Sequence, residues 1–105
     1  MKWAKKLIYG TEAGKKRTRY VMRLKMGKKI PGLSVIVISP ESPNQFEIID
    51  SMFLMQKRYP KDDLIVVGIA KGWYEAVELM EHLSQKVYDE TGTLDMKKYV
   101  LEHGV

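Results

Sequence analysis

The sequence predicts an α/β domain of element order βαβαβα, built in two or three layers around a mostly parallel three-stranded sheet, with a short extra C-terminal helix. Residues 33–39 and 64–70 are nearly continuous runs of β-branched and aliphatic residues. Such runs are typical of strands buried on both faces of a parallel sheet. Apolar residues between and after these runs recur at helical spacing instead. The length of 105 residues suits one domain over residues 1–105.

The first strand is expected over residues 5–10 (KKLIYG), a short apolar run. This run is less apolar than the two later ones. Because central strands need apolar side chains on both faces, we place the first strand near an edge of the sheet.

Residues 18–26 (TRYVMRLKM) fit two structures. A strand would place alternate apolar side chains, from Tyr20 to Met26, on one face. A helix would group Tyr20 and Leu24 with Arg17, would use good helix formers, and would end at Gly27. We favour the helix because it gives three successive strand–helix units. The alternative is an N-terminal β-hairpin followed by βαβα.

A helix is also predicted over residues 42–59. The segment Ser42-Pro43-Asn44-Gln45 supplies an N-cap serine, a proline at the first helical position and a glutamine at the third. Pro60 ends this helix after Tyr59. It would join the two apolar strands through a right-handed crossover. Its apolar stripe is Phe46, Ile49, Met52 and Phe53.

Two helices are predicted at the C-terminal end. Apolar residues from Trp73 to Val87 recur at helical spacing, with charged residues on the other side, and predict a helix over about residues 73–90. Thr91-Gly92 ends it. Asp95 can cap a last helix over residues 96–103, closed by Gly104.

The charge is divided unevenly along the chain. Residues 1–30 hold eleven Lys or Arg and one acid, a net charge of +10, whereas residues 31–105 hold seven and twelve, a net charge of −5. A basic part of this kind can attract a polyanion, hold the two halves together, or orient self-association.

The basic segment from Lys15 to Lys29 has the composition of a nucleic-acid-binding surface, where cations contact phosphates and an aromatic ring stacks on a base. A solvated basic face is the alternative, since no recognised DNA- or RNA-binding motif accompanies these charges. The candidate residues for binding an anion or nucleic acid are Lys15, Lys16, Arg17, Arg19, Tyr20 and Arg23.

The loop from Gly10 to Lys16 has the general plan of a phosphate-binding loop but departs from the Walker A motif. Gly10 and Gly14 enclose three residues rather than four, and Lys16 stands where the motif has a hydroxyl for magnesium. A weaker role remains: if the next segment is helical, free amides near Gly14 favour an anion. The alternative is a solvated turn.

A second candidate site is the cleft beyond the carboxyl ends of the strands, where ligands of parallel sheets gather. The residues expected there are hydroxyls, cations and one aromatic, which could hold a phosphate and stack a base. Trp73 also fits a core position, because it shares helical spacing with Val77 and Met80. The cleft residues are Gly10, Thr11, Gly14, Ser39, Ser42, Asn44, Lys71, Gly72 and Trp73.

Composition excludes several kinds of chemistry. The chain has no cysteine, which removes disulfides, thiolate catalysis and Cys-based zinc or iron–sulfur sites. His82 and His103 have no suitably spaced partner for a metal site or a triad. We therefore expect no catalytic residue, no metal and no cofactor. The apolar runs are shorter than the roughly 20 residues of a membrane span, and no secretory signal is expected, so the expected location is the cytoplasm.

The expected function is that of a small non-catalytic protein whose basic N-terminal third binds an anionic partner, either nucleic acid or a phosphorylated small molecule. One alternative is an assembly protein that forms a homodimer through sheet edges or methionine-rich helix faces. The other is a small enzyme that acts on a phosphorylated substrate at the strand ends.

Overall fold

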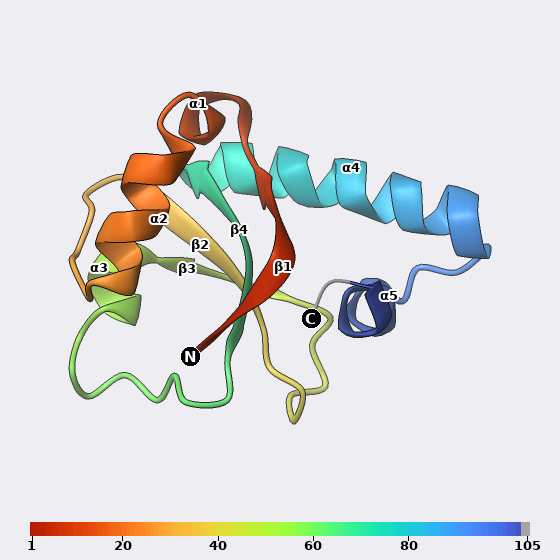
Figure 1. Ribbon diagram of the computed structural model, residues 1–105. Coiled ribbons are helices and arrows are strands. Elements are labelled where there is room, and N and C mark those ends of the chain that lie inside the picture. The colour runs from red at the N-terminus through yellow and green to blue at the C-terminus, as the bar shows by residue number, and fades with distance from the viewer. Residues whose placement is uncertain (104–105) are drawn as a thin grey trace.

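The computed structural model describes residues 1–103, which form a four-stranded mixed sheet covered by helices on both faces (Figure 1). The strand order is β1-β4-β2-β3, with β1 and β4 parallel and the other two pairings antiparallel. The elements are β1 (Lys2–Tyr9), α1 (Thr11–Gly14), α2 (Arg17–Lys25), β2 (Leu33–Ile38), β3 (Glu47–Asp50), α3 (Ser51–Leu54), β4 (Ile65–Lys71), α4 (Trp73–Thr91) and α5 (Met96–His103).

The α/β class is confirmed, and the layers number three. On one face of the sheet, Ala13, Leu24 and Leu54 bring α1, α2 and α3 into a core with alternate residues of β2. On the other face, Met80 and Val100 bring α4 and α5 into a second core. Both faces of the central strands β2 and β4 are therefore shielded from solvent, as their continuous apolar sequences require.

The two apolar strands are confirmed, but the crossover between them is wrong. β2 and β4 are neighbours that run antiparallel, with Leu33 opposite Lys71 and Ile38 opposite Ile65. The sheet is consequently mixed rather than mostly parallel. The reason for the error is that burial on both faces produces the same continuous apolar run whether a strand is parallel or antiparallel.

The helix expected over residues 42–59 is also wrong. Glu47–Asp50 forms β3, an antiparallel edge strand on β2. Ile48 packs against the core on one face of the sheet, and Ile49 packs against the core on the other. An extended chain thus partly buries both β-branched side chains, one on each face, and adds a hydrogen-bonded ladder.

The supposed helix start at Ser42 makes a turn instead. Ser42 Oγ accepts a hydrogen bond from the Asn44 N–H at 3.1 Å, which is a local turn contact. The helix of this region is α3, where Asp50 caps the start by accepting from the Met52 N–H at 2.8 Å. Phe53, expected in a buried stripe, is 59% exposed.

The other predicted elements are confirmed. β1 is an edge strand, residues 17–25 are the helix α2, and α4 and α5 lie where expected. Gly92 adopts a positive φ of 74° at the end of α4, as a C-terminal glycine should. Gly104, expected to close the last helix, lies outside the described residues.

Candidate anion-binding surface

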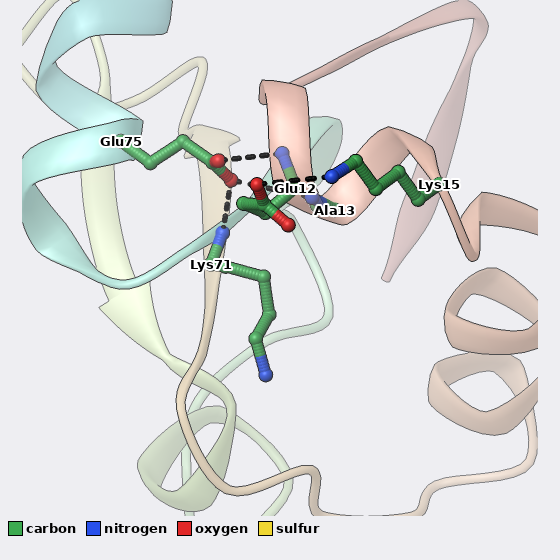
Figure 2. A network of polar contacts seen from close by, with 5 residues as sticks. All are labelled: Glu12, Ala13, Lys15, Lys71 and Glu75. Atoms are coloured by element: carbon green, nitrogen blue, oxygen red, sulfur yellow. Dashed lines mark hydrogen bonds and ion pairs between the residues drawn. The ribbon is translucent and has the colours of Figure 1, made fainter.

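The end of the sheet where β1 and β4 finish carries a short polar network built around Glu75 (Figure 2). Glu75 lies in the first turn of α4. Its carboxylate accepts hydrogen bonds from the backbone N–H of Glu12 at 2.7 Å, of Ala13 at 3.4 Å, and of Lys71. One side chain therefore ties the start of α1, the end of β4 and the start of α4 together.

The pKa of Glu75 lies below its ordinary value of 4.5. Partial burial alone would raise this pKa, since it disfavours the charged form. The hydrogen bonds from the amides of Lys71, Glu12 and Ala13, with the charge of Lys71, outweigh the burial because they stabilise the carboxylate. The Glu75 carboxylate is thus an anion of the chain itself, held by backbone N–H donors.

This internal anion changes the interpretation of the loop after β1. The N–H groups at the start of α1, which a phosphate would need, already donate to Glu75. Gly10 is buried against the same carboxylate, and a Cβ at Gly10 would lie 2.3 Å from a Glu75 oxygen. The loop is consequently a docking point for α4, and Gly10 and Thr11 do not form an open phosphate cradle.

The start of α2 is arranged differently. No side chain among the described residues caps this helix, whose N-cap position is Lys16. Residues 14–19 line a shallow, largely polar hollow of about 410 Å³ at this helix start. The amides of the first turn of α2 and the surrounding cations therefore face the same space. The exposed cations here are Lys15, Lys16, Arg17 and Arg19.

The outer face of α2 extends this positive region. Residues 15–29 carry eight Lys or Arg and no acid, and all eight side chains are exposed. The one ion pair among residues 1–103 joins Lys15 Nζ to Glu12 Oε1 at 3.2 Å. We call Lys15, Lys16, Arg17, Arg19 and Arg23 the basic surface.

Some nearby cations rest on aromatic rings. The Arg17 guanidinium lies 5.7 Å from the ring centroid of Tyr9, and Lys25 Nζ lies 5.1 Å from that of Trp3. These contacts fix α2 against β1. Among the cations of the basic surface, Lys16, Arg19 and Arg23 have no such contact within the described chain.

Tyr20 is less exposed than the cations around it. Its half-buried ring packs against the core under α2, and Lys71 Nζ covers it at 5.7 Å from the centroid. The ring therefore contributes to the packing of α2 against the core. Lys71, in turn, adds a cation beside the basic surface.

The expected strand-end cleft is divided between the two ends of the sheet. Because β2 runs antiparallel to β4, the residues after β2 lie at the opposite end from the residues after β1 and β4. One end holds Gly10, Thr11, Gly14, Lys71, Gly72 and Trp73, and the other holds Ser39, Ser42 and Asn44.

The distant group makes local contacts at its own end. The Ser42 N–H donates to the Ser39 carbonyl oxygen at 3.1 Å, and the Ser42 carbonyl oxygen accepts from Lys97 Nζ of α5. Asn44 Nδ2 donates to Glu47 at 3.4 Å. These residues hold the turn before β3 against α5.

Trp73, for which a core position was the alternative to the cleft, is exposed. It is 60% exposed, and the next residue, Tyr74, is 86% exposed. Gly72 precedes them with a φ of 88°, so the chain turns sharply from β4 into α4. Trp73 and Met80 do share helical spacing. Met80 packs in the core under α4, whereas Trp73, in the first turn of the helix, is exposed.

Sequence reasoning missed the roles of Glu75 and Tyr74. Glu75 occupies the third position of α4, where an acid commonly bonds back to amides before the helix. That position is a local signal for a capping acid. The partners on α1, however, are 62 and 63 residues away in the chain, and no local pattern specifies them.

Metal-ligating side chains do not gather in the described part of the chain. Residues 1–103 contain no cluster of three or more His, Asp or Glu side chains that could hold a metal ion. Within that same range, none of the helices combines the length and the apolar character needed to cross a bilayer.

The chain matches no protein-family model, no curated protein and no solved structure.

Proposed function

We propose that this chain binds a polyanion through the basic surface, with nucleic acid ahead of a small phosphorylated ligand. One observation carries the proposal: a single turn and helix present five exposed cations, and a carboxylate pairs with only one of them, Lys15, within residues 1–103. Such an uncompensated group attracts phosphates and releases their counterions on binding.

The shape of the site favours an extended ligand. A small phosphate is usually held by several amides in a closed loop. Here the amides at the start of α1 are occupied by Glu75, and the hollow at the start of α2 is shallow. Cations spread along α2 instead match phosphates that repeat along a strand.

The test is the affinity for labelled oligonucleotides, measured by fluorescence anisotropy at low salt. The variant Arg19→Ala/Arg23→Ala removes two exposed charges that make no ion pair or cation–π contact with residues 1–103. The matched control is Lys86→Ala/Lys98→Ala, which removes two exposed charges from α4 and α5.

We expect the α2 variant to weaken binding by about tenfold or more, and the control by about twofold or less, because the affinity depends on how many cations touch phosphates. Equal losses of affinity in the two variants would show a non-localised charge effect and would contradict the assignment to α2. No measurable binding of the unmodified chain would contradict the function itself.

Two further functions remain predictions. Homodimerisation through an edge strand or an apolar helix face is tested by light scattering at tens of micromolar, where a mass of one chain would exclude it.

An enzyme acting on a phosphorylated substrate would have to use groups from one end of the sheet, because Ser39 lies at the end opposite to Lys71.

A further inference from the structure

Two aromatic side chains stand exposed at the start of α4. Trp73 is 60% exposed and Tyr74 is 86% exposed, and their rings form an edge-to-face pair with centroids 5.6 Å apart. Large aromatic rings gain most from burial. A pair this exposed leaves aromatic surface open to a ligand.

The aromatic pair lies at the same end of the sheet as the basic surface. Glu75, the residue after Tyr74, bonds to the amides of Glu12 and Ala13 on α1 (Figure 2). Glu12 in turn pairs with Lys15 of the basic surface. The first turn of α4, which carries the aromatic pair, is therefore tied to the segment that carries Lys15.

The acids between these two regions already have partners. Glu75 is held by three backbone amides, and Glu12 is paired with Lys15. The other acids of α4 begin at Glu78 and continue towards Glu90 at the far end of the helix. A phosphate chain that follows α2 can thus reach the first turn of α4 before meeting uncompensated negative charge.

We propose that the polyanion is single-stranded nucleic acid, and that Trp73 and Tyr74 form a platform on which its unpaired bases stack. This inference rests on the proposed function, since the basic surface supplies the attraction for the phosphates. Cations along the backbone combined with exposed rings for the bases are the usual means of binding single strands. A duplex keeps its bases stacked inside and leaves the platform unused.

The experiment compares one oligonucleotide as a single strand and as a duplex, in DNA and RNA forms. The variant Trp73→Ala/Tyr74→Ala removes both rings. The control is Tyr88→Ala, which removes a ring that is 53% exposed near the other end of α4. Thermal unfolding of each variant checks that it is folded; both rings of the platform are exposed, so we expect little change.

We expect single strands to bind more tightly than the duplex, and the platform variant to lose about tenfold or more of its single-strand affinity. Duplex affinity should stay within about twofold, and Tyr88→Ala should behave as the unmodified chain. Stacking does not read the 2′-hydroxyl, so DNA and RNA strands should respond alike. A response confined to RNA would overturn stacking as the source of selectivity.

Tryptophan fluorescence gives a second readout. The other tryptophan, Trp3, is half-buried beneath Lys25. Quenching on addition of a single strand should therefore come mainly from Trp73 and should disappear in Trp73→Phe.

The outcomes separate the two proposals. Binding that depends on Arg19 and Arg23, but is equal for single strands and duplex and unchanged in the platform variant, would overturn the stacking platform and leave the proposed function standing. Absence of any oligonucleotide binding would overturn both.

Discussion

Glu75 determines what the loop after β1 does. The loop has the two glycines and the basic flank of an anion site, but its donors are taken by this carboxylate from α4. The Glu75 carboxylate stabilises the fold by accepting these hydrogen bonds. The uncapped start of α2 is then the nearby place where a bound anion could be held. The same carboxylate lies directly against Gly10, so a Cβ at that position would force the Glu75 side chain to shift.

Replacing this carboxylate should destabilise the fold. The variant Glu75→Gln keeps the size of the side chain but puts an NH₂ group where one carboxylate oxygen accepts from an amide. We expect the free energy of unfolding at pH 7 to fall by about 1 kcal/mol, the scale of a helix-capping interaction, with partial solvent screening included. Urea unfolding measures it, and Glu78→Gln, an exposed acid on the same helix, is the control. Equal losses of stability in the two variants would contradict the structural role of Glu75.

The pH dependence follows from the lowered pKa. The unfolded chain has the ordinary glutamate pKa of 4.5, and the folded pKa lies below it. Stability from Glu75 is therefore fully present above pH 4.5 and is lost as the pH falls through the folded pKa. The difference between the unmodified chain and Glu75→Gln should shrink on acidification below pH 4.5. A difference that grows instead would mean that the folded pKa is raised.

At the residue scale, the sequence predicted that the cations of the basic surface are exposed, but it did not predict how the aromatic side chains near them are packed. The exposed cations of the basic surface are where a solvated helix face puts them. Tyr20, expected as a base-stacking ring, packs partly buried under α2, whereas Trp73 is exposed at a strand end, as the predicted cleft placed it, and does not take the alternative core position. Helical spacing alone could not decide between these environments, because the buried side of a helix depends on which element packs against it. Burial of a single ring depends on the packed layer above it, and that layer is set by tertiary contacts.

The element scale shows why only part of the fold could be predicted. Long apolar runs and caps specify β2, β4 and α4, whose local patterns are strong. Residues 42–53 carry a capping signature followed by a helical stripe, yet Glu47–Asp50 within this segment pairs with β2 as β3. The edge of an existing sheet provides that ladder, so the tertiary context overrides the local preference.

The contact between β1 and β4 offers a test at this scale. The two strands approach so closely at Gly68 that an added Cβ would lie 2.7 Å from the backbone oxygen of Ile8. Backbone cannot move aside as a flexible side chain can. Gly68→Ala should therefore lower the free energy of unfolding by about 1–3 kcal/mol, measured by urea unfolding.

Gly14→Ala is the matched control for that variant. A Cβ there would lie 3.5 Å from the Tyr9 Cβ, an ordinary contact, and the residue is helical. We expect Gly14→Ala to be neutral or to add up to about 1 kcal/mol of stability. If Gly68→Ala were as stable as Gly14→Ala, the close approach of β1 and β4 would be wrong.

At the scale of the whole molecule, the sheet lies between the basic helix α2 and the acidic helix α4. The helix α2 packs on one face, and the helix α4, with five acids and one lysine, packs on the other (Figure 1). The strongly basic helix and the strongly acidic helix thus lie on different faces of the sheet. A polyanion should approach the α2 face and be repelled from the outer part of α4.

The most direct test of binding by the basic surface is the salt dependence of oligonucleotide binding by the unmodified chain. Each phosphate neutralised releases counterions, so the affinity should fall by about tenfold or more between about 50 and 200 mM salt, linearly on logarithmic axes. That result would support binding by the basic surface. An affinity that does not change with salt, or no binding at the lower concentration, would contradict it.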